Sequence, residues 1–133
     1  MTDSAPSAWA EESPLATYQA HLDEGQLAYQ WSVAAGRAVF YPRLVCPFSG
    51  STALEWRIAS GGGTIYAATV VYPRGGEPYS IVLVDADEGF RLMSRVIDCP
   101  PEAVTIGQRV VLTVRRLEPE GEPLPLFRLE VAT

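Results

Sequence analysis

The second half of the chain contains five short segments rich in β-branched and aromatic residues, separated by glycine, proline and acidic residues. They follow the run SGGG at residues 60–63, and they are GTIYAATVVY (63–72), YSIVLV (79–84), FRLMSRV (90–96), RVVLTVRRL (109–117) and LFRLEV (126–131). Segments of this kind are typical of β-strands. Five strands whose longest connections follow the third and fourth strands favour a five-stranded Greek-key barrel of the OB type. A sandwich of the immunoglobulin type would need about seven strands.

The predicted strands also indicate which side chains fill the barrel. We expect its core to contain Val70, Val82, Leu92, Val110 and Leu112. Between the third and fourth strands, residues 98–106 carry two consecutive prolines. We expect this segment to replace the helix that often lies there in such barrels.

Residues 27–59 contain two tight turns, AAGR and PFSGS, joined by the connector RAVFYPR. This arrangement is typical of a small zinc ribbon, in which four thiolates from two turns hold one tetrahedral ion. The four ligand positions are Ser32, Ala35, Cys46 and Ser49, and only Cys46 supplies a thiolate. We therefore predict a degenerate, metal-free ribbon hairpin with strands at 27–31 and 38–41, in which Cys46 is a vestige. No metal or other cofactor is expected.

The residues before the ribbon divide into a polar tail (1–13) and a short helix (14–26). Ser13 followed by Pro14 is typical of a helix start, and Gly25 of a helix end. Tyr18 and Leu22 form an apolar stripe at helical spacing. The remaining divisions are the ribbon (27–59) and the barrel (60–133), so the chain is predicted to be all-β apart from this helix.

The charge and residue inventory exclude several functions. Ten arginines against sixteen acidic residues give a net charge of −6, which is unfavourable for binding nucleic acid. A single-stranded nucleic-acid binder remains an alternative, because Tyr66, Tyr72, Tyr79 and Phe90 could stack on bases. The chain has no lysine and only one histidine, His21, so we predict no catalytic residues.

Two further sequence features concern ions and location. Asp85, Asp87 and Glu88 lack the twelve-residue pattern of a calcium loop and are predicted to lie in a hairpin turn with Gly89. Two widely spaced cysteines, no signal peptide and no long apolar run predict a cytoplasmic protein without membrane contact.

The order of short motifs resembles one known family. The motifs are DEGQL, QWSVAAGR, FYPRLVCPFSGS, LEWRIASGGGTIYAATVVYP, PYSIVLVDADEGFRLMSRV and VTIGQRVVL. Together they resemble the DUF35 family, small proteins with a rubredoxin-like zinc ribbon followed by an OB-fold. The family pattern expects cysteines at Ser32, Ala35 and Ser49, where this chain departs from it.

The resemblance implies a non-catalytic accessory subunit of a thiolase-fold acyl-CoA enzyme, such as a thiolase, retro-aldolase or acyltransferase. It would stabilise that complex and help to form the acyl-CoA entrance. A MaoC-type hydratase is the alternative partner that the resemblance implies. Because one small barrel cannot cover all the aromatic side chains, we predict a partner interface at Tyr18, Leu22, Trp31, Phe40, Tyr41, Arg43 and Phe48. Arg74 is predicted to contact CoA.

Overall fold

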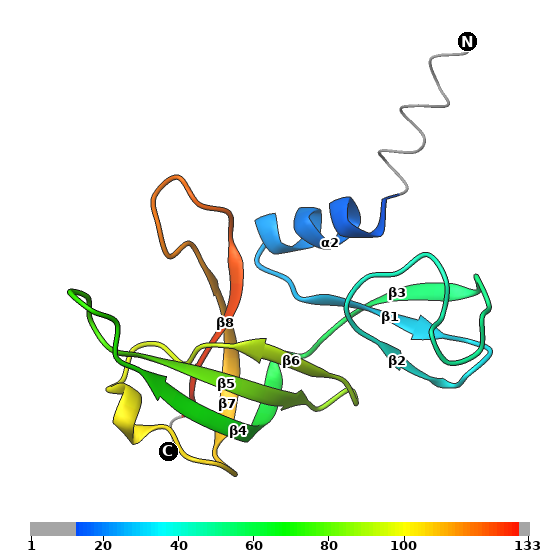
Figure 1. The fold of residues 1–133 in the computed structure, drawn as a ribbon. Helices are drawn as coiled ribbons and strands as arrows, with labels where there is room; N and C mark the ends of the chain where they lie inside the picture. Colours follow the sequence, from blue (N-terminus) through cyan, green and yellow to red (C-terminus); the bar gives the residue numbers. More distant parts are fainter. Residues whose placement is uncertain (1–12, 131–133) are drawn as a thin grey trace. The chain divides into compact units, whose positions relative to one another are not determined.

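The structure, a computed structural model, describes residues 13–130. The chain divides into two compact units, Met1–Ile58 and Ala59–Thr133, which we call the N-terminal unit and the barrel unit (Figure 1). The predicted tail, apart from Ser13, and residue 131 of the fifth predicted strand lie outside the described residues. No helix in the described part is long and apolar enough to cross a membrane.

The N-terminal unit begins with the predicted helix, α2 (Pro14–Asp23). The Ala16 N–H donates to Ser13 Oγ at 3.4 Å, which satisfies one of the free N–H groups at the helix start. After the helix, Gly25 has a φ of 80°, a conformation that glycine adopts without strain. Tyr18 and Leu22 are the buried residues of α2.

The ribbon region contains three strands, not the predicted two. They are β1 (Ala28–Ser32), β2 (Arg37–Val39) and β3 (Leu54–Ile58), in the order β2-β1-β3 with both pairings antiparallel. Gln30 lies opposite Val39 on one side and Trp56 on the other. The predicted hairpin is present as β1 and β2, but the third strand was not predicted. It pairs along the whole of β1 and makes the hairpin part of a three-stranded sheet.

The barrel unit contains the five predicted strands. They are β4 (Gly62–Val71), β5 (Tyr79–Ala86), β6 (Arg91–Ser94), β7 (Arg109–Arg115) and β8 (Leu124–Leu129). The sheet order is β6-β5-β4-β7-β8, and a parallel bridge between Val96 and Phe127 joins its two ends (Figure 1). A short 3-10 helix, η1 (Pro101–Ala103), stands in the proline segment. This confirms the predicted OB-type architecture.

The barrel core follows the alternation of β5, where every second residue from Ser80 to Ala86 is buried. Of the five predicted core residues, Val82, Leu92 and Val110 are buried. Val70 and Leu112 are only half-buried, so their prediction was wrong. Strand β4 pairs with β7 only through residues 62–64, so Val70 lies where β4 has a neighbouring strand on one side only.

Candidate functional site

Besides Leu15 in α2 and Ile58 in β3, the large apolar side chains exposed in the N-terminal unit lie in its turns and in the long connection from β2 to β3. We call these residues the ribbon surface; they are Val33, Tyr41, Leu44, Val45 and Phe48. Leu44 is 65% exposed and Phe48 is 53% exposed. A soluble protein rarely leaves this many large apolar groups in one small unit open to water unless they contact a partner.

Arginines accompany the aromatic residues of this unit. The Arg37 guanidinium lies 3.6 Å from the centre of the Phe48 ring, and the Arg57 guanidinium lies 4.4 Å from that of Trp31. Such stacking holds the arginine side chains in place. Aromatic residues and arginine are also the types enriched at the centres of protein interfaces.

The predicted interface residues divide into three groups by exposure. Tyr41, Arg43 and Phe48 are exposed, as an interface requires. Tyr18 and Leu22 are buried, so their prediction as partner contacts was wrong. The helical stripe is real, but its side chains fill the core of their own unit: the Tyr18 ring meets Phe40 edge-on, with centres 5.7 Å apart.

The remaining two predicted residues, Trp31 and Phe40, are half-buried. Burial, with a smaller contribution from Tyr41, raises the pKa of Tyr18 to about 12, which agrees with its place in the core. Sequence reasoning missed Leu44 and Val45. They could have been recognised as two adjacent apolar residues between Pro42 and Pro47, because these prolines disfavour a strand or helix that would bury them.

A buried glutamine positions the connection that carries the ribbon surface. The Arg43 N–H donates to Gln30 Oε1 at 2.7 Å, and Gln30 Nε2 donates to the Arg43 carbonyl at 2.8 Å. Gln30 is only 4% exposed, so these two bonds satisfy an amide that has little access to water. The backbone at Arg43 is thereby tied to β1 while its side chain stays exposed.

We expect Gln30→Met to destabilise the N-terminal unit by roughly 1–3 kcal/mol, because it leaves the backbone groups of Arg43 without partners. The matched control is Gln108→Met. Gln108 makes the same kind of double contact, to Thr105 and Ala103, but in an exposed loop. Urea unfolding followed by tryptophan fluorescence measures the effect, since all three tryptophans precede the barrel unit. Equal losses for both variants would contradict a special role for the buried amide.

The ligand positions of the predicted ribbon lie in the two turns of the N-terminal unit. Cys46 is buried, and the Phe48 N–H donates to its sulfur at 3.4 Å. Burial raises the pKa of Cys46, but hydrogen bonds from Ser32, Ser49 and the backbone of Phe48 and Ser49 outweigh it and lower the pKa to about 7. One thiol, two hydroxyls and the methyl group of Ala35 do not fit the soft four-coordinate shell of structural zinc. Within residues 13–130 no group of three or more His, Cys, Asp or Glu side chains is placed to hold a metal ion.

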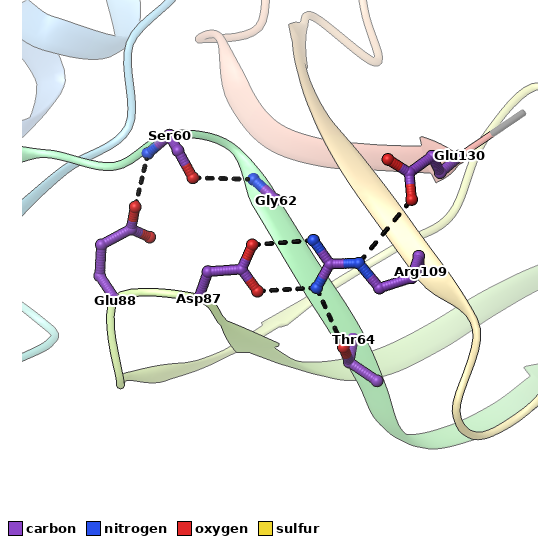
Figure 2. A network of polar contacts seen from close by, with 7 residues as sticks. All are labelled: Ser60, Gly62, Thr64, Asp87, Glu88, Arg109 and Glu130. Atoms are coloured by element: carbon purple, nitrogen blue, oxygen red, sulfur yellow. Dashed lines mark hydrogen bonds and ion pairs between the residues drawn. The ribbon is translucent and has the colours of Figure 1, made fainter.

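The barrel unit carries a polar network around the turn between β5 and β6 (Figure 2). Arg109 makes two bonds to the Asp87 carboxylate, at 2.7 and 2.8 Å, and its Nε lies 3.7 Å from Glu130. The Ser60 N–H donates to Glu88 at 2.8 Å. A Cβ on residue 62 would lie 2.5 Å from Asp87 Oδ2, so a larger residue there would displace this carboxylate.

The predicted turn is confirmed, with Gly89 at a φ of 99°. The acidic residues in it are not merely solvated, however. Asp85 accepts from Arg91 at 2.6 Å, and Asp87 and Glu88 hold the contacts described above. All three acidic side chains therefore contact other residues of the barrel unit. We expect these contacts to stabilise the fold of that unit.

The pKa of Asp87 is lowered, mainly by its hydrogen bonds with Arg109, which outweigh the opposing effect of burial. Because this pKa is lower in the folded than in the unfolded chain, the contribution is present above pH 4 and is lost as the pH falls through the folded value. We expect wild type to be more stable than Asp87→Asn at pH 7, with a smaller difference at pH 3. Urea midpoints at both pH values test this. A constant difference would show that Asp87 acts through its shape and not its charge.

The aromatic residues of the barrel do not form an open stacking platform. Phe90 is buried. The Arg91 guanidinium lies 3.5 Å from the centre of the Tyr66 ring, and Arg95 lies 3.9 Å from that of Tyr79. One ring face of Tyr66 and one of Tyr79 are therefore occupied by the protein itself, whereas Tyr72 is 66% exposed.

The barrel unit also has a groove of about 300 Å³, which was not predicted from the sequence. It is lined by Ile81, Met93, Ser94, Arg95, Leu117, Leu124, Pro125 and Leu126. Its volume lies at the small end of ligand sites, and most of its walls are apolar. The groove is thus a second exposed apolar surface, separate in sequence from the ribbon surface.

The remaining candidate residues are Arg74, His21 and Cys99. Arg74 is exposed, and no residue of the range 13–130 forms a hydrogen bond or ion pair with its side chain. His21 Nδ1 lies 3.0 Å from Gln26 Oε1, and its ring is tilted 38° against Trp56. Burial and the charge of Asp98 raise the pKa of Cys99, which makes it a poor nucleophile. None of these groups lies in an arrangement that could perform acid–base or nucleophilic catalysis.

The fold defines a class of small two-part proteins, in which a helix and a three-stranded sheet are followed by an OB barrel. The sequence profile described as "ChsH2, C-terminal OB-fold domain" matches residues 56–115. A "DUF35 domain-containing scaffold protein" of Methanothermobacter thermautotrophicus is 34% identical over 91 residues, 63% of this chain and 68% of that protein. The chain belongs to the DUF35 family.

Two further relatives carry enzyme names. A solved structure of an "Ltp2-ChsH2(DUF35) aldolase" superposes with a TM-score of 0.76 at 30% identity, covering 87% of this chain and 94% of the other. A "Probable enoyl-CoA hydratase alpha subunit" of Thermomonospora curvata is 34% identical over 91 residues, which are 65% of this chain but only 28% of that protein.

Proposed function

We propose that this chain is a non-catalytic accessory subunit of a thiolase-fold enzyme that acts on acyl-CoA thioesters. The observation that carries the proposal is the likeness to the DUF35 chain of an aldolase complex over nearly the full length of that chain. One property of the described residues supports it: the ribbon surface exposes aromatic and aliphatic side chains. The partner would supply the catalytic groups.

The contact with the partner is placed on the ribbon surface, with Arg43 at its edge. This set omits the predicted Tyr18 and Leu22, which are buried, and Trp31 and Phe40, which are half-buried. It adds Val33, Leu44 and Val45, which are exposed. The proposal includes a cytoplasmic location, which suits two free cysteines.

A MaoC-type hydratase is the second candidate partner, because one relative is named as a hydratase subunit. Affinity purification of the full chain from its native host separates the two. A thiolase-fold protein in equal amount supports the first candidate, and a hydratase supports the second. Activity of the captured enzyme is then measured with and without this chain. Elution of the chain alone, with full partner activity in its absence, would overturn the accessory role.

We expect Arg74→Ala to leave the complex whole and to weaken its affinity for the CoA ester roughly tenfold, the equivalent of ~1.4 kcal/mol for one charged contact to a phosphate. The basis is an exposed guanidinium in the loop 73–78 without a partner among residues 13–130. Arg116→Ala is the control, since the Arg116 guanidinium is bonded to the Gly121 carbonyl. Titration of the purified complex with a CoA ester measures both variants. Unchanged affinity for Arg74→Ala would remove this residue from the CoA site.

A further inference from the structure

The groove on the barrel unit lies where contact between the two edge strands, β6 and β8, ends. The Phe127 N–H donates to the Arg95 carbonyl at 3.0 Å, next to the parallel bridge that joins the ends of the sheet. A parallel ladder would continue with the N–H two residues before Phe127, but that residue is Pro125, which has no N–H. Residues 93–95 and 124–126, which come just before the bridge on its two sides, line the groove. The proline thus accounts for an opening at this place.

The walls of the groove are mostly apolar and open to water. Met93, Leu117 and Leu124 line it with exposed side chains, and no acidic residue is among the lining residues of the described chain. Its volume of about 300 Å³ corresponds to roughly ten groups of the size of a water molecule, which takes up about 30 Å³ in the liquid. A short alkyl chain with one polar end group is a ligand of that size.

One lining residue, Arg95, carries a positive charge without a counter-charge. Its guanidinium lies 3.9 Å from the centre of the Tyr79 ring, and no carboxylate in the described part of the chain forms an ion pair with it. Arg91, on β6, also stacks on a tyrosine ring, at 3.5 Å, but it bonds in addition to the Asp85 carboxylate at 2.6 Å. The two arginines have the same aromatic support, and Arg95 leaves a place for a carboxylate from another molecule.

We propose that the groove binds a small amphiphile with one carboxylate and an unbranched alkyl chain, an alkanoate of about eight carbons. The carboxylate is held by Arg95, whose planar guanidinium matches two carboxylate oxygens. The alkyl chain lies along Met93 and Leu124 and displaces water from these apolar walls. All of these residues belong to the barrel unit, so the site does not depend on the proposed enzyme partner.

Calorimetric titration of the full chain with octanoate tests the proposal. We expect a single saturable site with roughly millimolar or tighter affinity. Hexanoate should bind roughly tenfold more weakly than octanoate, because each buried methylene group strengthens binding about fourfold. 1-Octanol has the same alkyl chain without the charge, and it should also bind about tenfold more weakly or worse.

Substitutions in the groove separate the charge from the apolar walls. Arg95→Met should weaken octanoate binding about tenfold or more and leave 1-octanol binding nearly unchanged. Met93→Asp, at an exposed position, should abolish binding of both compounds, because it places a charge beside the alkyl chain. The control is Arg91→Met, which removes the arginine that already has a carboxylate partner and should change octanoate binding very little. Circular dichroism checks that each variant is folded.

Several results would overturn the proposal. Octanoate that does not saturate wild type, or that binds to Met93→Asp as tightly as to wild type, does not occupy the groove. Equal binding of octanoate and 1-octanol would show that the site does not recognise a carboxylate, and this comparison needs no variant to fold. Loss of self-association, or of binding to the enzyme partner, in Met93→Asp would show that a protein segment fills the groove instead.

Discussion

Leu44→Asp should weaken binding of this chain to its enzyme partner by a hundredfold to more than a thousandfold. The expected cost is ~3–5 kcal/mol, because the complex would bury a carboxylate that has no counter-charge. Leu44 is the best position on the ribbon surface for this test, since its side chain is 65% exposed and can be changed without disturbing the core of its unit. Size-exclusion chromatography and calorimetry of the purified subunits measure the loss.

The matched control is Met93→Asp. Met93 is 58% exposed and lines the groove on the barrel unit, so the same charge is placed on the other apolar surface. Tight binding by Met93→Asp together with weak binding by Leu44→Asp assigns the interface to the ribbon surface. The reverse pattern would contradict that assignment and move the contact to the groove.

Phe127→Ala should nearly unfold the barrel, at a cost of ~3–5 kcal/mol. Phe127 is the largest of the fully buried side chains, and its backbone forms the bridge with Val96 that joins the two ends of the sheet. Hydrogen exchange of the β4 and β5 amides should therefore become a hundredfold to several thousandfold faster. The control, Tyr72→Ala, removes an aromatic ring that is 66% exposed and should change exchange very little. Similar exchange in both variants would show that Phe127 does not support the core.

The strands of the barrel were predictable because each is a local pattern bounded by its own turn. The alternation in residues 79–86 marks β5, and Gly89 marks the turn that follows it. In contrast, β3 was missed because LEWRI is a short stretch whose identity depends on pairing with β1, twenty-six residues earlier at the register of Gln30 and Trp56. Long-range pairing leaves no local trace in a single sequence.

The candidate interface was predictable only in part, for a related reason. The spacing of Tyr18 and Leu22 identifies which face of the helix is apolar, but not what covers that face. Their own unit covers it. Leu44 and Val45 were missed because exposed apolar residues in a loop have no periodicity to detect. The polar contacts of Gln30 likewise depend on Arg43, a residue thirteen positions away.

The hydrogen bond from the Ser60 N–H to Glu88 has a consequence for how such chains can be rearranged in evolution. It ties the first residues of the barrel to a turn within the barrel, so a gene segment that starts at Ala59 carries both partners with it. All seven residues drawn in Figure 2 belong to that segment. Fusing it behind an unrelated protein would break none of these contacts, and the joint can fall at residue 59 without redesign of the polar network.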